Sequence, residues 1–171
     1  TTVTRRTAVQ AIVAFPTIIP ASVLGQDAPS KRINVGAIGV GRISRGHDMK
    51  EVLRHKDAHI VAVCDLDTKR LAAGQRFVDE AYAKRDGRAY AGTRGDADYR
   101  ALLADKDIDA VLISTPDHQH ARLAVDAVRA GKDVYLQKPA SLTISEGRIM
   151  ADAVKASGRI LQIGSQQRGQ E

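Results

Sequence analysis

The stretch INVGAIGVGRIS, residues 33–44, joins an apolar run to two closely spaced glycines and then to a polar segment that suits a helix. A strand, a glycine turn and a helix in this order are typical of dinucleotide-binding folds. The first glycine permits a tight turn, and the second lets a diphosphate approach the backbone. The third glycine of the usual G-x-G-x-x-G pattern is replaced by Ser44, which is small but weakens the match. The diphosphate is therefore predicted to lie against Gly39 and Gly41, at the start of the helix that follows.

An acidic residue follows a second apolar run, at the distance that a bound adenosine ribose requires. Residues 59–64 predict a strand, and Asp65 comes directly after it, 24 positions beyond Gly41. A carboxylate about 20 residues after the glycine turn binds the hydroxyls of this ribose. Because a carboxylate repels a 2′-phosphate, Asp65 favours NAD over NADP, although Arg70 keeps NADP open. The alternative is a scaffold of the same fold that binds no nucleotide.

The rest of the chain alternates strands and helices, which is typical of an α/β fold with a doubly wound, mostly parallel sheet. Asp67 is placed to cap the helix that starts at Thr68, and the spacing of Thr143 and Glu146 predicts a capping box. The stretch DGRAYAGTRGD, residues 86–96, is predicted to be a variable loop. The predicted strands are 33–38, 59–64, 109–114, 133–136 and 159–163, and the predicted helices after the first are 68–84, 99–104, one from Thr115 (N-cap) and Pro116 to Gly131, and one from 143 to Gly158.

The composition excludes several classes of protein. A chain of 171 residues with 43% hydrophobic and 27% charged residues suits one soluble domain with appendages. The net charge of +6 is spread along the chain, and only 4% of the residues are aromatic, so we predict no nucleic-acid binding. Cys64 is the sole cysteine, which excludes an internal disulfide and a cysteine metal cluster. His118 and His120 face apart on a helix, so we predict no metal site.

Residues 1–32 differ from the rest in composition and resemble an export signal. Arg5 and Arg6 precede a nearly uncharged run, which is the order of a twin-arginine signal, although Ala8 stands where an aromatic residue is usual. The run is broken by Pro16 and Pro20 and is too short to span a bilayer. The expectation is an exported, periplasmic protein without a membrane anchor after processing. The alternative is a surface helix or tail, which would leave the protein in the cytoplasm.

Three loop motifs together resemble the Gfo/Idh/MocA family of nicotinamide-dependent sugar oxidoreductases. The motifs are the glycine turn, CDLD at 64–67, and Thr115-Pro116-x-x-x-His120 with the later Gln137-Lys138-Pro139. The resemblance covers residues 33 to about 168 and implies a Rossmann domain followed by a substrate-binding domain that this chain does not contain. The domain boundaries predicted on this basis are 1–32 for the signal and linker, 33–163 for the Rossmann domain, and 164–171 for the start of the connection to the second domain.

The same resemblance implies roles for the later motifs. Lys138 would orient the substrate and handle a proton beside the nicotinamide. The family usually has Glu-Lys-Pro here, so Gln137 departs from the pattern and keeps only hydrogen bonds to the ribose or to neighbouring groups. It also places Arg42 and Ile43, with Gly39 and Gly41, around the diphosphate. The other residues implied to lie near the cofactor are Thr115, Pro116, His120 and Gln166.

These features predict an NAD-dependent oxidoreductase that moves a hydride between the cofactor and a secondary alcohol of a sugar, cyclitol or polyol. By the resemblance, the missing domain would supply a general base and an oligomer interface, so the present chain would bind nucleotide without turnover. One alternative is a glycoside-cleaving enzyme that uses tightly bound NAD for a transient oxidation. Another is a non-catalytic nucleotide-binding module.

Overall fold

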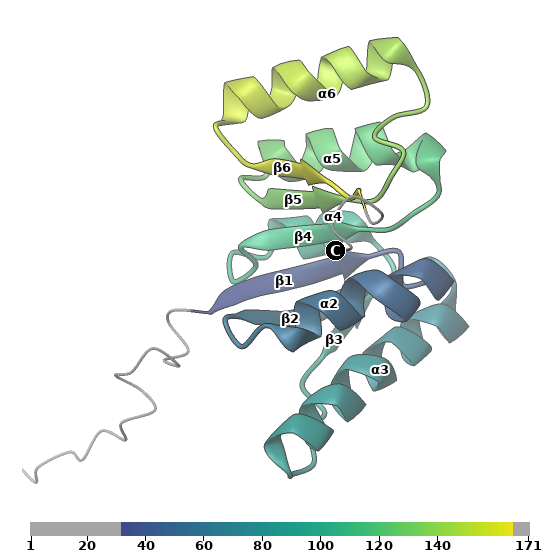
Figure 1. Cartoon of the computed structure of the whole chain (residues 1–171), viewed down its shortest axis with the longest axis vertical. Helices are drawn as coiled ribbons and strands as arrows, with labels where there is room; N and C mark the ends of the chain where they lie inside the picture. Colours follow the sequence, from purple (N-terminus) through teal and green to yellow (C-terminus); the bar gives the residue numbers. More distant parts are fainter. Residues whose placement is uncertain (1–31, 166–171) are drawn as a thin grey trace, which may run out of the picture.

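A computed structural model describes residues 32–165, which form a six-stranded parallel sheet with helices on both faces (Figure 1). The strand order is β3-β2-β1-β4-β5-β6, so the chain reverses its direction of travel across the sheet between β1 and β4. This confirms the doubly wound α/β fold, and ligands of such folds bind where the order reverses. The strands are β1 (Ile33–Ile38), β2 (Ala58–Cys64), β3 (Arg94–Asp96), β4 (Ala110–Ile113), β5 (Asp133–Leu136) and β6 (Leu161–Ile163). The helices are η2 (Ser44–Asp48), α2 (Met49–Arg54), α3 (Thr68–Asp86), α4 (Tyr99–Ala104), η3 (Asp117–Gln119), α5 (His120–Arg129) and α6 (Ile144–Ser157).

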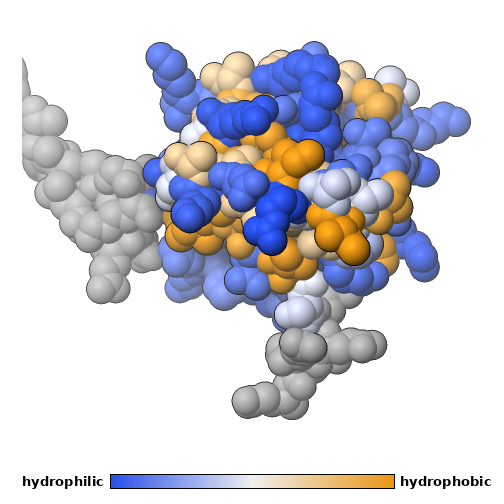
Figure 2. Space-filling model, turned by 90° about the horizontal axis from the view of Figure 1, so that it is seen from above, coloured by the Kyte–Doolittle hydropathy of each residue, from blue (hydrophilic) through white to orange (hydrophobic). Residues whose placement is uncertain are grey.

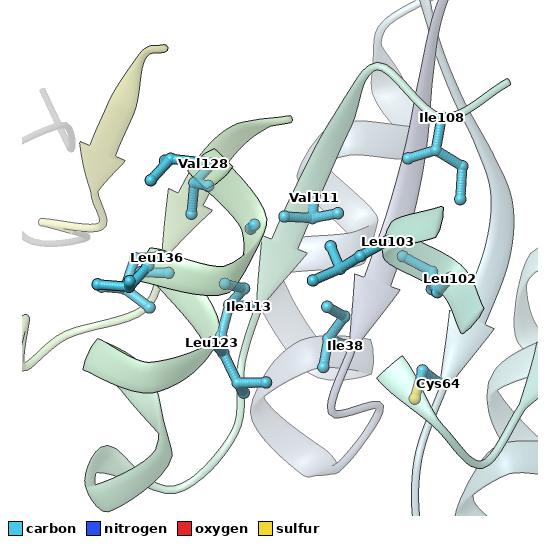
Figure 3. Packing of buried hydrophobic residues seen from close by; sticks show 14 of the residues in the cluster. Ile38, Cys64, Leu102, Leu103, Ile108, Val111, Ile113, Leu123, Val128 and Leu136 are labelled. Atoms are coloured by element: carbon cyan, nitrogen blue, oxygen red, sulfur yellow. The ribbon is translucent and has the colours of Figure 1, made fainter. Parts of the chain in front are cut away.

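The sheet separates two hydrophobic clusters. One cluster packs strand residues against α4, α5 and α6. Figure 3 shows strand side chains such as Ile38 and Ile113 beside Leu102 of α4 and Leu123 of α5. The other packs residues of β1 and β2 against Met49 of α2 and Val78 of α3. Because both faces are covered, β1 can be nearly continuously apolar. Residues of the first cluster include Leu102, Leu103, Ile108, Val111, Leu123 and Val128.

Local signals fix several helix ends as predicted. Asp67 accepts hydrogen bonds from the backbone N–H groups of Lys69 and Arg70 at 2.8 and 3.0 Å, so it caps α3. Thr143 and Glu146 form the predicted capping box at the start of α6. That helix ends at Gly158, whose φ of 66° lies in the left-handed region that glycine adopts without strain.

Two predictions about elements are wrong. The segment taken as a loop contains β3, the edge strand beside β2, and two side chains of α3 hold its approach: Gln75 bonds Thr93 O, and Asp79 accepts from Thr93 N. Pro116 is not the first residue of an α-helix, because its ψ of 148° is not helical. The short 3₁₀ helix η3 follows it, and α5 starts four residues later, at His120. The other boundaries agree within two or three residues.

The surface around α6 is mixed in character. Figure 2, viewed from above relative to Figure 1, shows hydrophobic residues interspersed among hydrophilic ones on this face. Ile144 and Ile149 of α6 are among the exposed hydrophobic residues. No helix within residues 32–165 combines the length and the hydropathy that a membrane span needs. The predicted signal (apart from Arg32) and Gln166 lie outside the described residues.

Candidate nucleotide-binding site

The glycine turn lies at the carboxyl end of β1, at the reversal of strand order. Gly39 has φ of 80° and donates its N–H to the carbonyl oxygen of Cys64 at 2.8 Å. A Cβ at this position would lie 2.8 Å from Thr115 Cγ2 and 3.0 Å from the Ser114 backbone. Position 39 therefore requires glycine for two reasons, the positive φ and the contact with the loop after β4.

Gly41 borders open space on the same edge. A Cβ built there would meet no atom within 4 Å. The first hydrogen bond of the following helix runs from Arg45 N to Gly41 O, so the N–H groups of residues 42–44 precede it and have no acceptor within the helix. These groups, together with the positive end of the helix dipole, suit a diphosphate. The predicted residues Gly39, Gly41, Arg42 and Ile43 are thus gathered at one turn.

Asp65 points its carboxylate at this turn. Its Oδ2 accepts the backbone N–H of Val40 at 3.0 Å, and its Oδ1 accepts that of Asp67 at the same distance. The residue is half-buried at the carboxyl end of β2. A carboxylate has about four acceptor positions, so these two bonds leave capacity for ribose hydroxyls. The protein's own bonds thus hold the carboxylate beside the glycine turn.

Two hydroxyl groups support the fit of a nucleotide to this edge. Thr115 Oγ1 and Ser44 Oγ are buried and have no hydrogen-bond partner among residues 32–165. Buried polar atoms are usually paired, and an orphan next to the glycine turn is available to a ligand. Three features of this edge therefore fit a dinucleotide. They are the open space beside Gly41, the helix N–H groups that lack an acceptor within the helix, and these two hydroxyl groups.

His120 connects two loops of the edge. Its ring is 1% exposed, with Nε2 2.8 Å from the carbonyl oxygen of Thr115 and Nδ1 2.6 Å from that of Pro139. The ring thus holds the loop after β4 against the loop after β5. Contact of His120 or of the exposed Pro116 with a cofactor stays a prediction. His118 is exposed, so the two histidines do not converge, and residues 32–165 contain no group of three potential metal ligands.

Lys138 and Gln137 follow β5 but have opposite surroundings. The Lys138 side chain is exposed, whereas Gln137 is buried, with 5% of its surface accessible. Gln137 Oε1 accepts the Lys138 backbone N–H at 2.9 Å, and Gln137 Nε2 donates to both carboxylate oxygens of Asp48 at 2.9 and 2.8 Å. Both polar atoms of the Gln137 amide are therefore hydrogen-bonded within the protein. The predicted contact of Gln137 with a ribose stays a prediction. Lys138 is exposed and lies just after the carboxyl end of β5, at the ligand-binding edge.

Asp48 is a site residue that the sequence did not single out. It is 3% exposed and also accepts hydrogen bonds from Ser114 Oγ at 2.7 Å and from His47 Nδ1 at 3.0 Å. Its position results from the π-helical turn η2, which places Ser44 and Asp48 on the buried side of the helix. Such turns are rare and occur frequently at functional sites. In the sequence, Asp48 stands in a polar run, where no hydrophobic periodicity indicates that its side chain is buried.

The protein also has two shallow hollows beside α5 and α6, of about 420 and 590 Å³. Their lining includes Arg122, Arg129 and Ile149, and neither includes a residue of the glycine turn. The site lies instead at the edge formed by the carboxyl ends of the strands, because the unpaired hydroxyls of Ser44 and Thr115 and the helix N-terminus after Gly41 are there. Burial raises the pKa of the Cys64 thiol, under this edge, to about 12, which disfavours the nucleophilic thiolate.

A parallel sheet with a glycine turn, an open helix N-terminus and an acid at its switch point defines a dinucleotide-binding Rossmann domain. The chain belongs to the oxidoreductase family with an NAD-binding Rossmann fold, Gfo/Idh/MocA, which it matches over residues 33–165. This confirms the resemblance, and the cofactor is a nicotinamide dinucleotide.

The chain is similar to proteins with different printed activities. It is 37% identical to glycosyl hydrolase family 109 protein 2 of Shewanella sp. (strain ANA-3) over 139 residues, covering 81% of this chain and 30% of that protein. It is 35% identical to an α-N-acetylgalactosaminidase of Shewanella oneidensis, over 73% of this chain and 27% of that one. The WlbA dehydrogenase of Bordetella pertussis, solved with NADH and UDP-GlcNAcA, superposes with a TM-score of 0.67 and 27% identity, over 81% of this chain and 36% of that one. The chain thus spans about a third of the length of these relatives.

Proposed function

We propose that the intact protein is an NAD-dependent oxidoreductase that acts on a secondary alcohol of a sugar, cyclitol or polyol. The observation that carries the proposal is the convergence of the open glycine turn, Asp65 and the exposed Lys138 on one edge of the sheet. The first two suit the diphosphate and the ribose. The third provides a polar group for a reacting hydroxyl.

The chemistry proposed for this edge is hydride transfer. When bound, NAD⁺ supplies the hydride acceptor. The alcohol carbon would give a hydride to the cofactor, and its oxygen would give a proton to the general base that the resemblance assigns to the second domain, which gives a ketone. Lys138 would hold the alcohol oxygen by a hydrogen bond and stabilise the negative charge that grows on it. The N–H groups of residues 42–44 and the carboxylate of Asp65 would fix the cofactor.

The proposal is tested first by titrating the protein with NADH and following fluorescence. Saturable binding is expected, and its absence would remove the proposal. The second test follows NAD⁺ reduction by the intact protein over a panel of sugars and cyclitols. Lys138→Met is expected to lower kcat on an active substrate by about 10²–10⁴-fold and to leave NADH affinity unchanged, because the side chain acts on the substrate. Lys155→Met, a matched change on α6, controls for the lost charge.

A second candidate function is glycoside cleavage through a transient oxidation. The similarity to two glycoside hydrolases, at 37% and 35% identity, favours it. In this reaction the sugar is oxidised, a neighbouring carbon–oxygen bond is eliminated, water adds, and the hydride returns, so no net redox change occurs. The same binding edge serves both reactions.

The two functions differ in how long the cofactor stays bound. A cleaving enzyme is expected to retain NAD through purification and dialysis. It is also expected to release nitrophenol from a nitrophenyl N-acetylgalactosaminide without added cofactor. A dehydrogenase loses NAD on dialysis and produces NADH in proportion to substrate consumed. Measuring bound NAD by absorbance after acid release distinguishes them.

We also propose that the protein is exported to the periplasm, based on the Arg5-Arg6 pair before an uncharged run. Cell fractionation tests this. Changing both arginines to lysine is expected to leave the protein in the cytoplasm, and unchanged fractionation would contradict a twin-arginine signal.

A further inference from the structure

We propose that Asp48 is a positioning residue for Lys138, acting through the buried amide of Gln137. The proposal rests on the proposed function, in which Lys138 faces the substrate. It adds a residue from a distant segment of the chain, 90 positions earlier in the sequence.

The first step is the cost of burying Asp48. Its side chain is 0% exposed. A carboxylate in such a place is expensive unless hydrogen bonds compensate it. Three side chains supply them: Gln137 with its Nε2, Ser114 with its Oγ, and His47 with its Nδ1. Ser114 follows β4, Gln137 follows β5, and His47 belongs to η2, so Asp48 ties three elements together at the ligand-binding edge.

The second step is the direction in which this restraint is passed on. The backbone N–H of Gln137 donates to Ile113 O at 2.9 Å, so β4 fixes its main chain. Asp48 fixes the amide nitrogen of the same residue, which leaves Oε1 aimed at the backbone N–H of Lys138 at 2.9 Å. The start of the exposed Lys138 side chain is therefore set by a series of two bonds that begins at Asp48.

The third step is the complementarity of the pair. A carboxylate at position 48 only accepts hydrogen bonds, so its partner at position 137 must donate one while it accepts from Lys138 N. Glutamine does both. A glutamate at position 137 would place two acceptors against each other inside the protein. The identity of residue 137 is thus explained by the carboxylate at position 48.

The experiment exchanges the two groups in the intact protein. The variants are Asp48→Asn, Gln137→Glu and the double exchange, with Asp152→Asn on the exposed face of α6 as the matched control. The readout is the hydrogen-exchange rate of the Lys138 amide, compared with that of the Ile113 amide in β4. In the double exchange, the new amide at position 48 donates to the new carboxylate at position 137. That carboxylate also accepts the Lys138 N–H, so the series of bonds is restored.

Each single variant is expected to accelerate exchange at Lys138 about tenfold or more beyond any change at Ile113. Asp48→Asn removes the charge that strengthens the bond from Gln137 Nε2, and Gln137→Glu removes the donor of that bond. The double exchange is expected to return the Lys138 rate to within about threefold of wild type. Equal acceleration at both amides would reduce Asp48 to a general stabiliser and overturn the proposal. A double exchange no better protected than the singles would overturn it also.

If a single variant does not fold, the double exchange decides alone: a folded protein with a protected Lys138 amide supports the proposal, and an unfolded or unprotected one overturns it. The NADH titration is run in parallel. Wild-type protein that fails to bind NADH contradicts the proposed function while the exchange rates still report on Asp48.

Discussion

Single glycines at the turn after β1 perform two different physical tasks. Gly39 is constrained by its positive φ and by Thr115, whereas Gly41 faces open space. We predict that Gly41→Val leaves the free energy of unfolding within about 0.5 kcal/mol of wild type, because the new side chain enters solvent. The same change is expected to weaken NADH binding about tenfold or more, because it fills the approach to the helix N–H groups. Denaturant unfolding and a fluorescence titration measure the two effects.

Gly39→Ala provides the contrast. It is expected to destabilise the protein by about 1–3 kcal/mol, because alanine is strained at this φ and its Cβ would contact Ser114 and Thr115. If Gly41→Val destabilised the protein as much as Gly39→Ala, or left NADH binding intact, the diphosphate would lie elsewhere.

His59 links stability to pH at the residue scale. Its ring stacks on Tyr82 at 4.3 Å, and burial, followed by the charges of Arg32 and Arg85, lowers its pKa from 6.5 despite the opposing charge of Asp86. The unfolded chain therefore binds the proton more readily. The contribution of His59 to the free energy of unfolding is therefore fully present above about pH 6.5. It is lost as the pH falls from there toward the lower pKa that His59 has in the folded protein.

The measurement is chemical denaturation from pH 7.5 to 5.5, in steps that bracket the unfolded pKa of 6.5. We predict a decline in wild type and a flatter curve in His59→Phe, which keeps a ring against Tyr82 and removes the titration. His55, an exposed histidine nearby in sequence, gives the control through His55→Phe. Parallel curves for wild type and His59→Phe would show that His59 does not contribute this linkage.

At the scale of elements, the capping box of α6 is a local device whose loss can be measured. Thr143 Oγ1 accepts the Glu146 N–H at 3.2 Å, and the Glu146 carboxylate accepts the Thr143 N–H at 3.0 Å. Thr143→Ala is expected to lower the free energy of unfolding by about 1 kcal/mol, since one helix N–H loses its partner. Thermal melting of this variant and of Thr68→Ala, the exposed first residue of α3, tests whether the cap causes the loss.

The elements that the sequence predicted are those whose signals are local. Asp67, Thr143 and Gly158 mark helix ends through bonds within a few residues, and all three predictions are confirmed. The strand β3 was missed because its three residues, RGD, carry no apolar alternation, and its place comes from β2 and from α3 side chains far away in sequence. The start of α5 was misplaced because proline is compatible with both an extended and a first helical position.

The residues of the candidate site also fall into two groups: those that a local sequence pattern predicts and those whose place depends on the fold. Gly39, Gly41 and Asp65 form a spaced pattern with a known physical role, so the sequence alone predicted them, and the structure gathers them at one turn. Asp48 was missed because its burial depends on the π-helical turn η2, which shifts the helix face that points inward. A helical period of 3.6 cannot reveal such a shift.

At the scale of the whole molecule, the parallel sheet is what makes one site from distant segments. The register of β1, β2, β4 and β5 brings their carboxyl ends to a single edge, where the groups that follow each strand meet. Their loops are joined by hydrogen bonds such as those of His120 and Asp48. A ligand at this edge therefore contacts several elements at once, and its binding energy adds to the stability of the folded domain.

This coupling gives the last prediction. A ligand that binds only the folded state stabilises it by about 2.7 kcal/mol at a concentration of 100 Kd. For a chain of 171 residues this raises the melting temperature by about 5–11 °C. We expect that rise with NADH, measured by calorimetry, and a smaller rise with NADPH at the same concentration, because the Asp65 carboxylate repels the 2′-phosphate. Asp65→Ser is expected to narrow the gap between the two cofactors. Equal rises in wild type would show that Asp65 does not discriminate, and no rise with NADH would mean that the edge of the sheet does not hold the dinucleotide.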